Sequence, residues 1–115
     1  MKDDRAFLMH ILDAIAAIQE YLAGATILGF RQSRLLQAAV VRELEIIGEA
    51  AKNLSEHTRQ ACSDVEWGEI IGLRNRLTHA YFQVDVDLVW EIAHTDVPAL
   101  DRKIREMVSQ LEAER

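Results

Sequence analysis

The stretch that decides the fold is residues 33–57, SRLLQAAVVRELEIIGEAAKNLSEH. Its apolar residues recur every three or four positions, which is the spacing of one face of an amphipathic helix. They are Leu36, Val40, Leu44, Ile47, Ala51 and Leu54. Ser33 suits the N-cap of this helix, because its hydroxyl can accept a hydrogen bond from a free backbone N–H of the first turn. The sequence therefore predicts one long helix from Ser33 to about His57.

The same spacing occurs on the N-terminal side of this stretch. Residues 4–23 repeat apolar side chains at helical intervals, and Asp3 or Asp4 can cap the start, so a first helix is expected there. Residues 24–32 contain two glycines and are expected to form a connector. A polar loop around residues 62–64 follows the second helix. A third helix is then expected from about Val65 into the stretch 74–81.

A last apolar seam begins near Asp85 and continues to Leu111. Pro98 lies within it, and proline is tolerated in the first turn of a helix but not in its interior. A break near Thr95 or Asp96 is therefore expected, with Pro98 in the first turn of a final helix. Long helices joined by short loops predict an all-α fold, an antiparallel four- to five-helix up-down bundle, with residues 1–115 as a single domain.

Composition limits the function classes. The chain has 115 residues, of which 50% are hydrophobic, so it can form a core without disulfides or metal. Its apolar runs are too short to span a membrane, and the single cysteine, Cys62, cannot form an intrachain disulfide, so a cytoplasmic protein is expected. The net charge of −6 argues against a broad nonspecific nucleic-acid binder, although a local basic cluster could still recruit RNA.

The stretch 74–81, RNRLTHAY, brings together three kinds of chemistry. Arg74 is a fixed cation, His79 titrates near neutral pH and Tyr81 carries a phenol. All three lie within about two helical turns. Few structural roles need this combination, whereas binding or cleaving a phosphodiester does.

On a regular helix at roughly 100° per residue, Arg74 falls within the apolar stripe that includes Trp67 and Leu77. An arginine there needs a carboxylate, a phosphate or water as its partner. One interpretation is a structural ion pair with a carboxylate of the second helix. The candidates are Glu43, Glu45 and Glu49.

His79 falls roughly 140° away from Arg74 on that helix and shares its face with Gly68 and Gly72. Glycines allow another backbone to approach closely, so this face is expected to be a contact surface. Two arrangements remain open. Either the helix ends near Thr78 and His79 swings round, or a second copy of the chain completes the site in a twofold dimer.

Other chemistry-bearing residues point to structure rather than catalysis. His10, His57 and His94 are isolated from one another and show none of the usual metal-ligand spacings, so no metal is expected. Trp67 and Trp90 lie on apolar seams and are expected in the core. No glycine-rich phosphate loop or nucleophile elbow is present in the sequence, and no cofactor is expected.

The spacing Arg74-x4-His79-x-Tyr81 resembles the Arg-x4-His-x-Tyr motif of HepT-like proteins, helical toxins of the HEPN superfamily that are also catalogued as a domain of unknown function. Residues 37–51 resemble the second helix of that family. Further matches follow in the family's order at Trp67, residues 71–75, 84–85, 89–90 and 96–100. The resemblance covers nearly the whole chain.

The resemblance implies a homodimeric, metal-independent endoribonuclease toxin, paired with a minimal nucleotidyltransferase antitoxin that adds AMP to the motif tyrosine, here Tyr81. In this hypothesis His79 acts as general acid or base and Arg74 stabilises the phosphate. Asn75 orients His79 or the phosphate, and Arg76 provides an extra phosphate contact. RNA is the expected substrate.

A second hypothesis comes from a different class of protein. The same helical bundle could be a non-catalytic subunit of a two-component nucleotidyltransferase that binds a nucleotide or presents a substrate. Arg74, His79 and Tyr81 would then form a pocket for a nucleotide phosphate. Growth arrest on expression of the chain alone distinguishes the toxin from this binding subunit.

Overall fold

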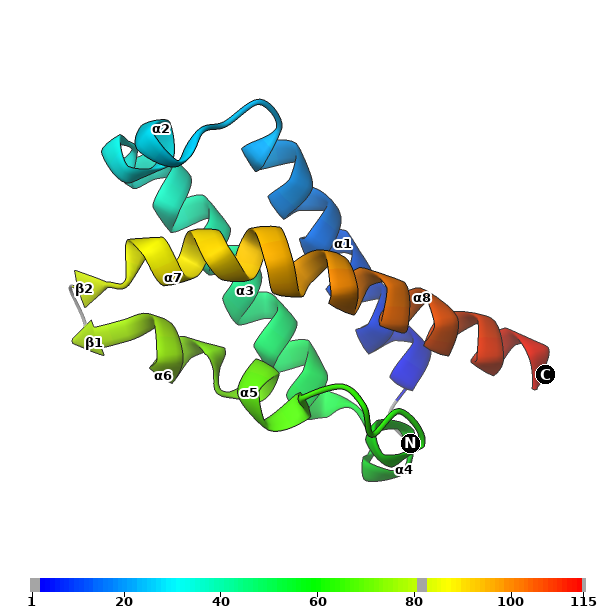
Figure 1. The fold of residues 1–115 in the computed structure, drawn as a ribbon. Helices are drawn as coiled ribbons and strands as arrows, with labels where there is room; N and C mark the ends of the chain where they lie inside the picture. The colour runs from blue at the N-terminus through cyan, green and yellow to red at the C-terminus, as the bar shows by residue number, and fades with distance from the viewer. Residues whose placement is uncertain (1–2, 81–82, 115) are drawn as a thin grey trace.

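The computed structural model describes residues 3–80 and 83–114, and of residues 79 and 80 the backbone alone. Helices dominate the fold (Figure 1). The long helices α1 (Asp4–Leu22) and α3 (Arg34–Asn53) lie side by side and antiparallel. The segments α7 (Val86–Glu91), η1 (Ile92–Asp96) and α8 (Val97–Ala113) form one continuous rod that crosses them. The predicted helical bundle is confirmed in this broad form.

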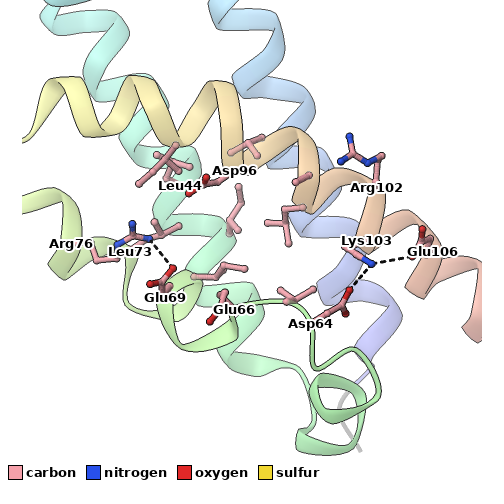
Figure 2. Close-up of a pocket in the computed structure, with 17 residues that line it drawn as sticks. Leu44, Asp64, Glu66, Glu69, Leu73, Arg76, Asp96, Arg102, Lys103 and Glu106 are labelled. Carbon is pink, nitrogen blue, oxygen red and sulfur yellow. Dashed lines mark ion pairs between the residues drawn. The ribbon is translucent and has the colours of Figure 1, made fainter.

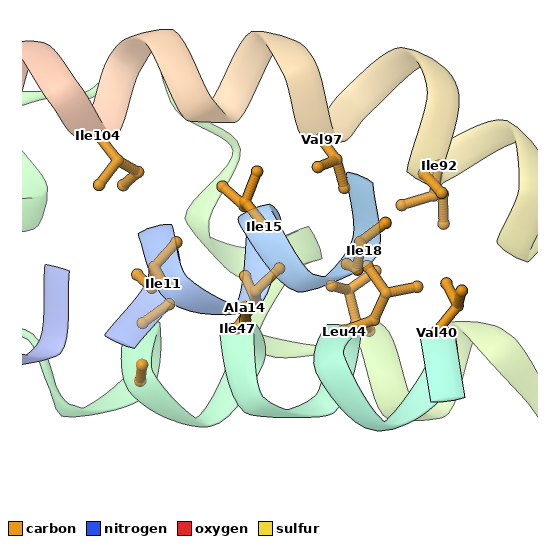
Figure 3. Close-up of a cluster of buried hydrophobic side chains, with 14 of the residues drawn as sticks. Ile11, Ala14, Ile15, Ile18, Val40, Leu44, Ile47, Ile92, Val97 and Ile104 are labelled. Carbon is orange, nitrogen blue, oxygen red and sulfur yellow. The ribbon is translucent and has the colours of Figure 1, made fainter. Parts of the chain in front are cut away.

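The core fills the space between α1, α3 and the rod (Figure 3). Apolar side chains from the three elements point toward one another there. From α1 they include Ile11, Ile15 and Ile18, from α3 Val40, Leu44 and Ile47, and from the rod Ile92, Val97 and Ile104. The α3 members belong to the seam that predicted this helix. Within residues 3–80 and 83–114, every helix is too short or too polar to cross a membrane.

The ends of α1 follow the prediction. The Asp3 side chain accepts a hydrogen bond from the backbone N–H of Ala6 at 3.3 Å and caps the first turn. The helix ends at Leu22, and Gly24 follows with φ of 74°. That left-handed conformation favours glycine over residues with a side chain.

Two short helices occur where the sequence predicted a connector and the end of a longer helix. The predicted connector contains α2 (Ile27–Gln32), because Thr26 caps its first turn and Phe30 buries its ring. The second predicted helix ends at Asn53 rather than at His57. A separate helix, α4 (Glu56–Ala61), begins after Ser55, whose hydroxyl accepts from the backbone N–H of Thr58 at 3.2 Å. In both places a capping hydroxyl starts a new helix.

The predicted break near Thr95 and Asp96 is a π-helical turn instead. The backbone N–H of Val97 donates to the carbonyl of Ile92, five residues earlier, so the rod continues without interruption. Pro98 lies in the first turn of α8, as predicted. The π turn accommodates the proline, which has no N–H to donate.

The third helix reaches the stretch 74–81, as predicted, but it is not continuous. It forms α5 (Trp67–Ile71) and α6 (Leu73–Leu77), separated by a turn at Gly72. The chain then continues into a two-stranded antiparallel hairpin of β1 (Thr78–Ala80) and β2 (Gln83–Val84). This is a correction to the sequence-based prediction, and its cause lies on α3.

Gly48 of α3 allows the end of α5 to approach the α3 backbone closely. A Cβ atom at Gly48 would lie 2.9 Å from the carbonyl oxygen of Ile70 and 3.5 Å from that of Ile71. The first distance is shorter than a normal contact, and moving the backbone of α5 aside costs free energy. By contrast, a Cβ atom at Gly68 would meet nothing within 4 Å. Within the described parts of this chain, the close backbone approach is at Gly48, and the contact surface predicted at Gly68 and Gly72 stays a prediction.

We expect Gly48→Ala to lower the free energy of unfolding by about 1–3 kcal/mol, because the added methyl forces α5 away from α3. Gly68→Ala is the matched control, since its methyl has free space and alanine favours helix by up to about 1 kcal/mol. Urea unfolding followed by circular dichroism, at one protein concentration, measures both. Equal stabilities of the two variants would contradict the close approach.

Candidate functional site

Helix α6 directs consecutive side chains to different surroundings. Leu73 and Leu77, one turn apart, are both buried and hold the inner side of the helix against the core. At about 100° per residue, Arg74 and Arg76 project to opposite sides of that inner edge, and Asn75 projects outward. Arg74 and Asn75 are exposed, whereas Arg76 is half-buried. The two arginines therefore serve different parts of the molecule.

Arg74 and Asn75 line an open cavity of about 490 Å³ between α3 and the α5–α6 bend, which we call the Arg74 cavity. Its α3 side is formed by Arg42, Glu45, Ile46, Gly48, Glu49 and Lys52. The expectation that Arg74 lies within an apolar stripe was wrong, because the turn at Gly72 changes the phase of α6 relative to α5. Among the described residues, no carboxylate lies within ion-pair distance of Arg74, so the structural ion pair with α3 is not formed.

Arg76 lines a second cavity, of about 500 Å³, between α3, the α5–α6 segment and the rod (Figure 2). We call it the Arg76 cavity. Leu44, Ile70 and Leu73 belong to its apolar lining, and charged groups surround them. The Arg76 guanidinium lies 3.9 Å from a Glu69 carboxylate oxygen. Arg76 thus does not share a cavity with Arg74 and Asn75.

The charged groups of the Arg76 cavity largely neutralise one another. Lys103 lies 2.5 Å from Asp64 and 4.0 Å from Glu106. The hydrogen bond from Lys103 holds the pKa of the Asp64 carboxyl below its usual range. Arg76 and Lys103 therefore have little free charge to offer a ligand.

His79 lies on β1, directly after the end of α6. The helix ends at Leu77, and Thr78 is already extended, with φ of −120° and ψ of 119°. This agrees with one of the two arrangements expected, in which the helix ends near Thr78. The His79 side chain and the whole of Tyr81 lie outside the described residues. The pairing of Arg74 with His79, and the role of Tyr81, stay predictions.

The backbone at the start of β1 is held by contacts with residues 84 and 85. Thr78 pairs with Val84 across the hairpin. The backbone N–H of Asp85 donates to the carbonyl of Leu77 at 2.8 Å, and the Asp85 carboxylate accepts from the N–H of Leu88 at 3.1 Å, which caps α7. The strand that carries His79 is thereby tied to the start of the rod.

The contribution of α3 to the Arg74 cavity was not predicted from the sequence motifs. Arg42, Glu45, Glu49 and Lys52 recur every three or four residues on the side of α3 away from the buried seam. That spacing is visible in the sequence, but it does not reveal that the α5–α6 bend lies against the same side. Glu45 and Glu49 were considered only as ion-pair partners.

His94 and the two tryptophans make structural contacts. The Nδ1 atom of His94 is 2.9 Å from the carbonyl oxygen of Trp90, and the two rings lie 3.8 Å apart. Trp67 is buried, and its indole N–H donates to the carbonyls of Arg59 and Cys62, each at 3.0 Å. Among the residues whose positions are described, no group of three or more His, Cys, Asp and Glu side chains is arranged to hold a metal ion.

Comparison with known proteins gives consistent results. The family model described as "Ribonuclease HepT-like" matches residues 11–107. A Caldanaerobacter subterraneus subsp. tengcongensis protein, named a putative RNase, is 38% identical over 110 residues, covering 96% of this chain and 98% of that protein. The probable ribonuclease HepT of Thermococcus cleftensis is 34% identical over 106 residues, covering 92% and 96%.

A longer relative contains the matching region as one part. This Methanocaldococcus jannaschii protein, named a gamma-glutamylcyclotransferase and putative RNase, is 40% identical over 111 residues. The match covers 96% of this chain but 50% of that protein, so the chain spans about half of its length. The comparison with solved structures gives no significant match.

The capping of α7 by the Asp85 carboxylate leads to a testable prediction. Asp85→Ala removes the N-cap of α7 and should lower the free energy of unfolding by about 1 kcal/mol. Asp85→Asn is the matched control, because asparagine caps a helix about as well as aspartate. Thermal and urea unfolding compare the variants. A loss that is as large for asparagine as for alanine would show that capping is not the reason.

Proposed function

This chain belongs to the HepT-like ribonuclease family, and from that premise we propose that it is a metal-independent endoribonuclease, the toxin of a toxin–antitoxin pair. One observation on this chain supports the proposal most directly. The exposed Arg74 has no carboxylate partner among the described residues, and it lines an open cavity of about 490 Å³. A guanidinium in that position is free to bind a phosphate.

The proposed reaction is an attack of the RNA 2′-hydroxyl on the adjacent phosphorus. The bond from the 2′-oxygen to phosphorus forms while the bond from phosphorus to the 5′-oxygen breaks. The products carry a 2′,3′-cyclic phosphate and a 5′-hydroxyl. One proton leaves the 2′-oxygen and another reaches the departing 5′-oxygen, so the reaction needs a general base and a general acid.

His79 is the proposed proton carrier, because an imidazole titrates close to neutral pH and serves in either protonation state. In a twofold dimer, His79 of one copy could act as base and His79 of the other as acid. Arg74 would bind the nonbridging oxygens and stabilise the charge that develops on them in the transition state. Asn75, which lines the same cavity, would orient the phosphate or His79.

Arg76 lines a different cavity from Arg74, so its proposed role is to support the site from the other side of α6 rather than to provide the extra phosphate contact that the sequence suggested. Its ion pair with Glu69 connects α6 to α5 across the turn at Gly72. Tyr81 would position the substrate. An AMP group placed on its phenol oxygen by a minimal nucleotidyltransferase antitoxin would add bulk and negative charge, which repels RNA. This partner and this modification come from the family resemblance.

The proposal includes a homodimer, with the active site at its cleft. Two observations on the single chain support a partner copy on this side. Arg74 and Asn75 are exposed beside the cavity, and Gly68 of the neighbouring α5 has free space where a Cβ atom would stand. A second α5 could approach closely there, as backbones do at glycine positions.

Removing either proposed catalytic group should abolish most of the activity. We expect Arg74→Ala and His79→Ala to cut single-stranded RNA at least about 100-fold more slowly, because charge stabilisation and proton transfer each contribute on that order. Arg102→Ala, which removes an exposed arginine from α8, is the control and should cut normally. Electrophoresis of labelled RNA measures the rates.

The same variants separate the two hypotheses in cells. Growth arrest that requires His79 supports the toxin. Harmless expression of the wild-type chain, together with tight binding to a nucleotidyltransferase, would favour the non-catalytic binding subunit. Undiminished RNA cleavage by either variant would remove that residue from the mechanism.

A shared cleft makes a prediction about mixtures. The wild-type protein should sediment as a dimer. Subunit exchange between Arg74→Ala and His79→Ala should restore no cleavage if both copies of His79 act at one phosphate, but part of it if one Arg74 and one His79 from different copies suffice. The mixed dimer keeps at most about half of the wild-type sites in that case. Full activity in a protein that sediments as a monomer would rule out the shared cleft.

A further inference from the structure

The outer side of α3 carries an ordered set of charges. Arg42, Glu45, Glu49 and Lys52 follow one another along the helix, with a cation at each end and the two carboxylates between them. All four line the Arg74 cavity, and Arg42, Glu49 and Lys52 are exposed. The buried seam of α3 occupies the opposite side. These charges therefore have no part in the core.

The cations of the Arg74 cavity differ from those of the Arg76 cavity in their partners. In the Arg76 cavity, Arg76 is paired with Glu69 and Lys103 with Asp64 (Figure 2), whereas its third cation, Arg102, makes no ion pair with the described residues. Within the described parts of the chain, neither Arg42 nor Lys52 lies within ion-pair distance of a carboxylate, and the same holds for Arg74. Their positive charge is available to a ligand.

The charge balance of the two cavities points the same way. Three cations and two carboxylates line the Arg74 cavity, whereas three cations and five carboxylates line the Arg76 cavity. In a chain with a net charge of −6, the Arg74 cavity is thus a locally positive place. An anionic ligand is attracted to it against the repulsion of the rest of the protein.

The positions along α3 suggest an extended ligand. Arg42 and Lys52 are ten residues apart, which corresponds to about 15 Å along a helix. The α5–α6 bend meets α3 near Gly48, between the two cations in the sequence of α3, and Arg74 lines the same cavity. A single phosphate cannot reach both ends of this arrangement, but a nucleic-acid strand can.

We propose that the Arg74 cavity is a track for the backbone of single-stranded RNA, in which Arg42 and Lys52 bind phosphates on either side of the one held by Arg74. Glu45 and Glu49 repel phosphates from the stretch of α3 between the two cations, so they fix the register of the strand. This inference rests on the proposed ribonuclease function and names how that site holds its substrate.

The experiment compares Arg42→Gln, Lys52→Gln and the double variant with Arg102→Gln. Each single change removes one exposed cation, and Arg102 of α8 lies on the other cavity, so Arg102→Gln is the matched control. All variants are made in the His79→Ala protein, which should bind RNA without cutting it. Fluorescence anisotropy with a labelled single-stranded oligoribonucleotide gives the affinity over a range of KCl concentrations.

Each lost phosphate contact should weaken binding several-fold and make the negative slope of log K against log[KCl] shallower by about 0.7. In the double variant the slope should become shallower by about 1.4. Arg42→Lys should retain the parent slope, and Arg102→Gln should change neither affinity nor slope. A residue with a merely structural role would leave the slope unchanged. Circular dichroism checks that the variants stay folded.

Three results would overturn the inference, and they are distinguishable. If the His79→Ala protein binds RNA, but Arg42→Gln and Lys52→Gln behave like Arg102→Gln, the track is wrong and the ribonuclease proposal stands. If the folded wild-type protein neither cuts nor binds RNA, the proposed function fails and the track fails with it. Equal losses for a mononucleotide such as AMP and for the oligoribonucleotide would show a pocket for one nucleotide instead of a track.

Discussion

The close packing of α5 against the backbone of α3 at Gly48 is the constraint on which the rest of the structure depends. The carbonyls of Ile70 and Ile71 occupy the space that a side chain at Gly48 would need. Because α5 ends against α3 in this way, the chain turns at Gly72 and starts α6 with a new phase. That phase decides which side chains of α6 enter the core and which reach the surface.

Two cavities with different electrostatics follow from this arrangement. Helix α6 sends Arg74 to one of them and Arg76 to the other, although only one residue separates them. Ion pairs satisfy Arg76 and Lys103, whereas Arg74 and the α3 cations beside it make none with the described residues. A protein with an overall negative charge thereby keeps unpaired positive charge beside the Arg74 cavity.

Much of the fold was predictable because it depends on local patterns. The apolar seam from Leu36 to Leu54 identified α3, and Asp3 and Pro98 marked helix starts that the structure confirms. The short helices were not predicted, because a cap such as Thr26 or Ser55 starts a helix without a long apolar period. The break at Gly72 was missed for another reason. A helical wheel assumes one rigid helix, and the glycine that permits the break lies in a different element, at Gly48.

The candidate site was predictable in part. The spacing of Arg74 and Asn75 from His79 identified a chemically unusual segment, and the structure brings Arg74 and Asn75 to one cavity. The charges of α3 repeat at helical spacing in the sequence, yet only the tertiary arrangement brings them to the same cavity. The side chain of His79 and residue Tyr81 lie outside the described residues, so their geometry remains a prediction.

The π-helical turn from Ile92 to Asp96 has a consequence for the rod. Val89 and Val97 are both buried, although eight residues of uninterrupted α-helix would place them about 80° apart around the axis. The wider turn corrects that rotation, so that α7 and α8 both bury apolar side chains. The π-helical turn thus fixes the rotation of α7, and of the hairpin before it, about the axis of α8. Removing one residue from this turn would rotate α7 and β2 by about 100° relative to α8, while α8 stayed packed against α1.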